Sequence, residues 1–317
     1  MKNGILTGVL LLVLTTAATA ADYPLRPVRI IVPFGAGSAT DVVARTIGQH
    51  LSAALGQQMV IDNRAGANGT IGAELAAKSP KDGYTLLMST NTPSAAAPSL
   101  MKKINYDPVH DFAPIGRIGT IAFVLVANPS VPAKNMKELI ALAKQQPGKL
   151  TAGSGSAGSL VPVFMLQQMA GITLNHIPYK SIPPALADVI SGQIHMVYAD
   201  MVTGTPQIKA GKVHALGVTS RQRAALLPEV PAIAETVRDF ELIAWFALFA
   251  PAGTPGTAIN RVETETRKIL ARDDVRQRFA AMGIDVAPLS PAELGKFQKS
   301  ELAKWARLAK AAGIQPE

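Results

Sequence analysis

The chain has 317 residues, of which 48% are hydrophobic and 5% aromatic, and its formal net charge is +9. It contains no cysteine, which excludes disulfide bonds, thiolate metal sites and cysteine nucleophiles. Lys and Arg are scattered along the sequence rather than grouped beside aromatic residues, so nucleic acid is not predicted as a partner. A dispersed positive charge is suited to attracting small anions.

Residues 1–20 are typical of a secretory signal peptide. Lys2 is followed by an apolar run from Ile5 to Leu14, and Ala18-Thr19-Ala20 forms an A-x-A cleavage site. We therefore predict cleavage before Ala21 and a soluble protein exported to the periplasm. The alternative is a membrane anchor, but the apolar run is shorter than a membrane-spanning helix requires, and no later segment is long enough.

After residue 20, short β-branched runs alternate with longer segments of helical periodicity. In chain order, the predicted strands are Val28 to Val32, Met59 to Asp62, Tyr84 to Met88, Ile115 to Ile118, Phe123 to Ala127, Leu150 to Gly153, Leu174 to Ile177, Ile194 to Ala199, Ala215 to Thr219 and Trp245 to Phe249. The predicted helices are Asp41 to Leu55, Ile71 to Ala77, Met136 to Gln146, Leu160 to Ala170, Pro184 to Ser191, Ala258 to Ala271 and Pro291 to Ala312. This alternation indicates α/β architecture with mostly parallel sheets. No flexible linker divides the chain, so we expect two lobes between which the chain crosses more than once.

The first predicted strand leads into a loop of small residues, Gly35 to Thr40, and then into a helix. Backbone N–H groups, two hydroxyls and the positive end of a helix dipole meet there, which predicts a site for a phosphate or carboxylate. Gly35-Ala36-Gly37 is also half of a dinucleotide fingerprint, with Asp62 near the position of a ribose-binding acid. However, Thr40 occupies the third glycine position, so that interpretation is weak.

A second loop of small residues, Gly153 to Ser159, also lies between a predicted strand and a predicted helix. It predicts another donor-rich anion site, with an ordinary strand–helix loop as the alternative. A hydrolase elbow is absent, because Ser154 rather than glycine stands two residues before Ser156. The five histidines stand apart, without the spacing of metal ligands. We therefore predict a binding protein without a metal, and an exported hydrolase is the alternative from another class.

Six blocks occur in a characteristic order: Pro33 to Arg45, Asp62 to Gly72, Pro80 to Leu87, Tyr106 to Ile115, Pro178 to Lys180 and Pro251 to Pro255. Together they resemble the solute-binding proteins of tripartite tricarboxylate transporters, also called Bug receptors, over essentially the whole chain after residue 20. The resemblance implies a two-lobed periplasmic-binding-protein (Venus flytrap) fold, with helices flanking a mostly parallel sheet in each lobe. We expect residues 21–122 and 240–317 to form the first lobe and residues 123–239 the second.

The resemblance also implies a monomeric receptor, not an enzyme and without a cofactor, that closes on a small organic carboxylate and delivers it to the integral-membrane subunits of the transporter. Presentation of the ligand to a membrane sensor kinase is the alternative. The first-lobe side of the site is expected at Phe34, Gly37, Ser38, Ala39, Thr40, Asp41, Asn63, Thr90 and Asn91, and the second-lobe side at Gly155, Ser156, Ser159, Tyr179 and Asp200. An ionised Asp41 cannot attract a carboxylate, so it is expected to complement the helix N-terminus or orient water.

Three positions depart from the family pattern. Ser38 stands where the family usually has a second glycine, so a hydroxyl is expected to replace bare backbone there. Leu160 stands where a histidine is common, and His195 stands where an aspartate is common. Ligand choice is therefore least predictable on the second lobe.

Overall fold

The structure is a computed structural model that describes residues 23–316. The predicted signal peptide and its cleavage site lie outside this range. Between residues 23 and 316, no helix is both long and apolar enough to cross a membrane.

The elements alternate between strands and helices along most of the chain. In order they are β1 (Val28–Val32), α1 (Ala39–Leu55), β2 (Met59–Asn63), α2 (Thr70–Ala77), β3 (Thr85–Thr90), α3 (Ala97–Leu100), β4 (Phe112–Ala127), α4 (Met136–Gln145), β5 (Thr151–Ser154), α5 (Ala157–Ala170), β6 (Asn175–Pro178), α6 (Ile182–Ser191), β7 (Met196–Asp200), α7 (Met201–Lys209), β8 (His214–Val218), β9 (Ile243–Pro251), α8 (Gly256–Ala271), α9 (Asp273–Ala280), β10 (Ile284–Leu289) and α10 (Pro291–Ala311). The predicted alternation of strands and helices is thus present.

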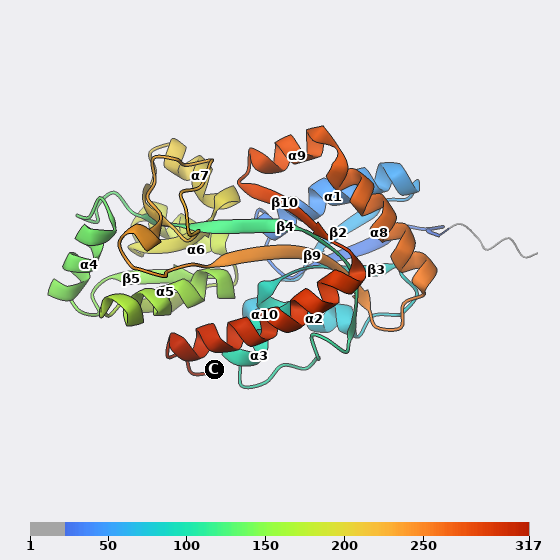
Figure 1. The fold of residues 1–317 in the computed structure, drawn as a ribbon, viewed down its shortest axis with the longest axis horizontal. Coiled ribbons are helices and arrows are strands. Elements are labelled where there is room, and N and C mark those ends of the chain that lie inside the picture. The colour runs from blue at the N-terminus through green and yellow to red at the C-terminus, as the bar shows by residue number, and fades with distance from the viewer. Residues whose placement is uncertain (1–22, 317) are drawn as a thin grey trace, which may run out of the picture.

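Two sheets are joined by one strand that belongs to both. The strand order is β2-β1-β3-β9-β4 in the first sheet and β4-β7-β5-β6 in the second, with β10 and β8 also paired to β4. Residues 112–122 of β4 pair with β9, whereas residues 123–127 pair with β7 and β8. Figure 1 shows β4 and β9 running side by side between a part that carries α4 to α7 and a part that carries α1, α2 and α8 to α10. We call the part built on the first sheet the first lobe and the other the second lobe.

The expected two-lobed α/β fold is confirmed, and both sheets are mixed. Strands β2, β1 and β3 are parallel, as are β6, β5 and β7. The pairs that involve β4 or β9 are antiparallel. Parallel neighbours need a crossover connection, usually a helix. By contrast, β4 passes from the first sheet into the second, and β9 brings the chain back into the first sheet.

Two predicted strands are a single element. The segments 115–118 and 123–127 both belong to the 16-residue strand β4. The register of β4 against β9 shifts between Pro114 and Gly116 and again between Arg117 and Gly119. Glycines that allow such irregularities break the alternation of side chains by which a long strand is recognised.

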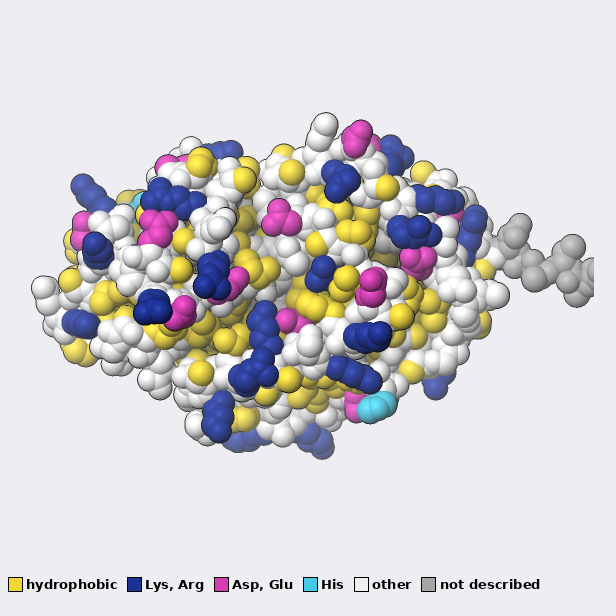
Figure 2. Space-filling model, viewed as in Figure 1, with side chains coloured by type: hydrophobic (Ala, Val, Ile, Leu, Met, Phe, Trp, Pro, Cys, Tyr) yellow, Lys and Arg dark blue, Asp and Glu magenta, His cyan; other side chains and the backbone are white. Residues whose placement is uncertain are grey.

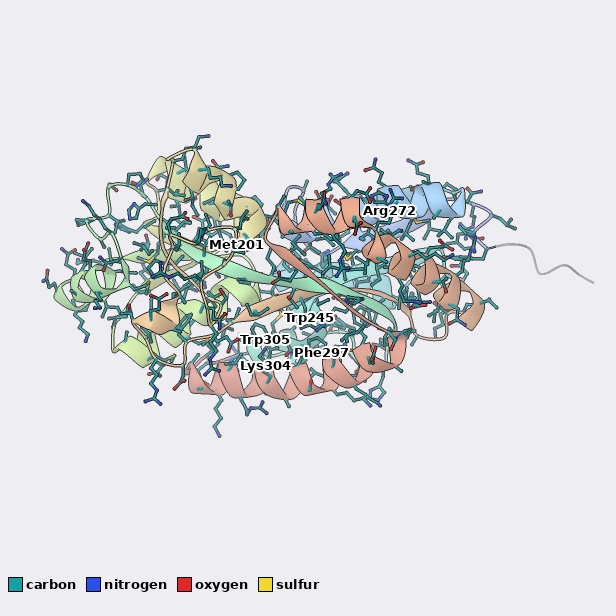
Figure 3. The ribbon with its side chains drawn as sticks, turned by 45° about the horizontal axis from the view of Figure 1, so that its top comes forward. Met201, Trp245, Arg272, Phe297, Lys304 and Trp305 are labelled. Atoms are coloured by element: carbon teal, nitrogen blue, oxygen red, sulfur yellow. The ribbon has the colours of Figure 1, made fainter. Side chains whose placement is uncertain are left out.

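Helix α10 is attached to the crossover strand β9 by a buried carboxylate. The indole Nε1 atoms of Trp245 on β9 and Trp305 on α10 donate to Glu301 Oε2 at 2.9 and 3.0 Å. Lys304 Nζ lies 3.2 Å from Glu301 Oε1, and the Phe297 ring packs edge-on against Trp245. Figure 3 shows Trp245, Phe297, Lys304 and Trp305 where α10 runs along the sheet. Both indoles and the carboxylate are buried, so these hydrogen bonds are shielded from water.

The lobes contact each other at positions far apart in the sequence. Thr92 Oγ1 of the first lobe accepts a hydrogen bond from Ala157 N of the second at 3.1 Å. Gly283, just before β10, lies against Met201 at the start of α7. A Cβ atom at position 283 would lie 2.6 Å from Met201 Cβ, so only glycine fits this contact.

Candidate ligand-binding cleft

A pocket lies between the two lobes. Strands β4 and β9 contribute apolar side chains, and loops of both lobes contribute most of the polar ones. The lining residues are Phe34, Ser38, Ala39, Thr40, Thr90, Asn91, Thr92, Ile121, Phe123, Gly155, Ser156, Ile182, Asp200, Ala244 and Phe246. None of them is Lys, Arg or His, although Figure 2 shows Lys and Arg spread over both lobes. An anion in this pocket would therefore be held by dipoles and hydrogen bonds rather than by a cation.

The first-lobe wall is the N-terminus of α1. Ser38 is the N-cap residue, and its Oγ accepts a hydrogen bond from Asp41 N at 3.3 Å. Gly37 N donates to Asp41 Oδ2 at 3.0 Å. Within the described residues, the backbone N–H groups of Ala39 and Thr40 have no acceptor. These two N–H groups lie at the positive end of the helix dipole of α1, an arrangement found in many anion-binding sites.

Asp41 holds this loop from behind and does not line the pocket. Its Oδ1 accepts from Asn63 Nδ2 at 2.9 Å, and its Oδ2 accepts from Arg45 Nε at 3.0 Å. Burial alone would raise the pKa of Asp41, but the hydrogen bonds from Arg45, Gly37 and Asn63 lower it below its ordinary value. Asn63 Nδ2 also donates to Phe34 O at 3.0 Å. The ionised Asp41 and the amide of Asn63 thus hold the loop in place.

Asn91 is a buried donor without a partner. It directly follows β3, only 1% of it is exposed, and it lines the pocket. Its Nδ2 has no hydrogen-bond partner among residues 23–316. Buried polar groups are nearly always paired in folded proteins, so this amide N–H group is available to donate a hydrogen bond to a ligand in the pocket.

The second-lobe loop is arranged differently from the first. Ser156 is the N-cap residue of α5, and the N–H groups of Gly155 and Ser156 donate to Ser159 Oγ at 2.9 and 3.1 Å. Ala157 N donates to Thr92 of the first lobe. The N–H groups of residues 155–157 are thus already paired within the protein, and the second backbone anion site expected at this loop stays a prediction, although Gly155 and Ser156 line the pocket.

Asp200 supplies the acidic group of the pocket. It ends β7 and caps α7, with Oδ1 accepting from Thr203 N at 2.9 Å. Only 3% of Asp200 is exposed. Burial disfavours the ionised form and raises the pKa of Asp200 to about 6.

The other expected residues lie behind the wall or elsewhere. Gly37, Asp41, Asn63 and Ser159 support the two loops without lining the pocket. Tyr179 lines a second cavity with Leu160, and its hydroxyl donates to Asp188 Oδ2 at 2.6 Å.

His195 is hydrogen bonded outside the cleft, since its Nδ1 lies 3.0 Å from Thr151 N and 2.7 Å from Thr151 Oγ1. The pocket also contains residues that sequence reasoning missed: Thr92, Ile121, Phe123, Ile182, Ala244 and Phe246. The four on β4 and β9 look like ordinary core positions in sequence, because nothing local shows that these strands cross between lobes.

Comparison with known proteins decides the family. A model of the tripartite tricarboxylate transporter family receptor matches residues 43–314. The chain belongs to this family. The receptor is 35% identical over 304 residues to the protein BugT of Bordetella pertussis, an alignment that covers 94% of this chain and 93% of BugT. Six named sequence blocks had already indicated this family, and that prediction is confirmed.

Solved structures agree with the family assignment. The receptor superposes on R. palustris Rpa4515 with adipate at a TM-score of 0.91, with 33% identity over 93% of this chain and all of that one. It superposes on MatC from Rhodopseudomonas palustris with bound malate at a TM-score of 0.84, with 29% identity over 90% of this chain and 99% of MatC. The receptor is thus a member of a family of periplasmic solute-binding proteins. Neither the hydrolase nor the sensor-kinase alternative is supported by these relatives.

Proposed function

We propose that the receptor binds a small organic carboxylate in the pocket between its lobes and presents it to the integral-membrane subunits of a tripartite transporter. The observation that carries the proposal is the unpaired, buried Nδ2 of Asn91. It lines the same pocket as Ala39 and Thr40, whose N–H groups lack an acceptor. Three donors and a helix dipole fit the oxygen atoms of one carboxylate. Bound adipate in Rpa4515 and malate in MatC support this class of ligand.

Closure of the lobes completes the proposed mechanism. The proposed lobes are residues 21–122 with 240–317 and residues 123–239, and they move about β4 and β9. Closing around the ligand removes water and strengthens the hydrogen bonds to the carboxylate. We further propose that the receptor acts as a monomer in the periplasm after removal of residues 1–20.

Asn91→Ala is expected to weaken the binding of adipate or malate at least tenfold. The change deletes one hydrogen bond to a charged group, which contributes roughly 1.5 kcal/mol or more. Titration calorimetry of the wild type, Asn91→Ala and the distant variant Lys299→Ala would measure the effect, with circular dichroism to verify folding. Equal affinity of all three proteins would contradict the proposed binding of the carboxylate at Asn91.

Ala39→Pro tests the helix terminus separately from the amide. Proline at the first helical position lacks only an N–H that no acceptor within residues 23–316 uses, and the extended backbone of Ser38 (φ −68°, ψ 157°) is compatible with a following proline. We expect about tenfold weaker binding of the same acids, with unchanged thermal unfolding. Wild-type affinity in this variant would show that the carboxylate does not use the N-terminus of α1.

A further inference from the structure

Asp200 gives the two walls of the pocket opposite hydrogen-bonding character. It is the one ionisable side chain among the fifteen residues that line the pocket in the described range. The first-lobe wall offers donors, namely Asn91 Nδ2 and the N–H groups of Ala39 and Thr40. On the second-lobe wall, by contrast, the N–H groups of Gly155 and Ser156 are already paired with Ser159. A ligand anchored at α1 therefore meets an acid at the other wall.

The charge of Asp200 is not balanced by a neighbouring cation. Its carboxylate caps α7 through Thr203 N, and no ion pair involving Asp200 occurs in residues 23–316. Apart from Asp200 itself, none of the charged or titratable side chains on β7, α7 and the elements packed against them lines the pocket or hydrogen bonds to Asp200. These side chains are Tyr198 of β7, Asp41, Arg45 and His50 of α1, Arg117 of β4, Asp188 of α6 and Lys209 of α7. An anionic group placed beside an ionised Asp200 would face an uncompensated like charge in a buried site.

On the basis of the proposed function, we propose that Asp200 makes the second-lobe wall a site for a hydrogen-bond donor on the ligand. A ligand with an ammonium or hydroxyl group at this end binds directly. A dicarboxylate binds only together with one proton from solvent, which is shared between Asp200 and the second carboxyl group of the ligand. Asp200 is thus the residue that distinguishes doubly ionised acids from amino and hydroxy acids.

The proposal predicts a pH dependence with a definite sign. Because burial raises the pKa of Asp200 to about 6, its protonated fraction is roughly one half at pH 6 and about 1% at pH 8. The apparent affinity for a dicarboxylate scales with the fraction of the protein in which Asp200 is protonated, so this affinity is expected to fall about 50-fold from pH 6 to pH 8. The affinity for a ligand with a terminal ammonium group is expected to stay within about threefold, since its partner is the ionised carboxylate.

The test compares wild type with Asp200→Asn. Asparagine keeps an oxygen to cap α7, cannot ionise, and offers an amide donor to the ligand. Calorimetric titrations with adipate and 6-aminohexanoate at pH 6 and pH 8, each in two buffers of different ionisation enthalpy, give affinity and proton uptake. Wild type is expected to take up about one proton per diacid at pH 8. Asp200→Asn is expected to take up none, to bind diacids equally at both pH values, and to bind them more tightly than wild type at pH 8.

Two results separate this inference from the proposed function. If the diacids bind to wild type without pH dependence, or if Asp200→Asn keeps the wild-type dependence, the role of Asp200 is overturned while carboxylate binding stands. If neither acid binds to either protein at either pH, the proposed function itself is contradicted. Thermal unfolding of both proteins at each pH shows whether a loss of binding reflects loss of the fold.

Discussion

Glu301→Ala is expected to lower the free energy of unfolding by about 4 kcal/mol, although residue 301 lies outside the binding cleft. The change removes the acceptor of both indole N–H groups, which lie 2.9 and 3.0 Å from Glu301 Oε2. Each buried donor left without a partner costs about 1–3 kcal/mol, and the lost side chain leaves a cavity besides. Denaturation by urea gives the free energy. The intrinsic fluorescence reports the site directly, because Trp245 and Trp305 are the only tryptophans in the chain.

Lys304→Ala is the matched control for this prediction. Lys304 pairs with the same carboxylate, but its side chain is 41% exposed, so removing it is expected to cost less than about 1 kcal/mol. If Glu301→Ala unfolds with the same free energy as Lys304→Ala, the shared carboxylate does not hold α10 against β9.

Gly283→Ala is expected to weaken ligand binding about a hundredfold without touching the pocket. Gly283 has φ 72°, and a Cβ atom there would lie 2.6 Å from Met201 Cβ in the other lobe. Overpacking of this kind costs about 1–3 kcal/mol. Here that cost destabilises the arrangement of the lobes in which residue 283 contacts Met201. Ligand affinity falls in proportion to the population of that arrangement. Calorimetry with adipate or malate measures the loss, and small-angle scattering measures how far the lobes separate.

Gly211→Ala separates backbone strain from contact between lobes. Gly211 has φ 67°, close to that of Gly283, but a Cβ atom there would have no neighbour within 4 Å. Both variants are expected to lose about 1 kcal/mol of stability through the left-handed backbone. Only Gly283→Ala is expected to lose affinity. A similar loss of affinity in Gly211→Ala would contradict the role of the contact between Gly283 and Met201.

Local signals in the sequence were enough to predict most helices and strands. The predicted helix Met136 to Gln146 is present as α4, and its start is fixed by Asn135, whose Oδ1 accepts a hydrogen bond from Glu138 N at 3.0 Å. Helix α7 was missed because Gly204 and Pro206 are poor helix formers, and its start depends on the buried cap at Asp200. Helix α9 and strand β10 were also missed; they fill the region between two predicted helices, and β10 is recognised only by its pairing with β4.

The candidate site, too, could be predicted from the sequence only where it depends on local signals. The first-lobe wall was accessible to sequence reasoning because Ser38 to Asp41 form one local strand–loop–helix unit. The second-lobe wall depends on which groups already satisfy one another, as when Ser159 occupies the donors of Gly155 and Ser156. Sequence spacing cannot show that pairing. The resemblance to the family located Asn91 and Asp200, but only the packed structure shows that one lacks a partner and that the other has no balancing charge.

The placement of β9 between β3 and β4 sets an order for biogenesis. All strands of the second lobe lie between residues 112 and 218, so that lobe has its complete sheet once this continuous stretch has been made. The first sheet stays open until residues 243–251 arrive, with the edges of β3 and of the first part of β4 unpaired. Exposed edges of this kind invite pairing with other chains. A chain interrupted near residue 240 would therefore have a complete second-lobe sheet and an open, aggregation-prone first sheet. The molecule can complete its fold only when the last quarter of the sequence is present.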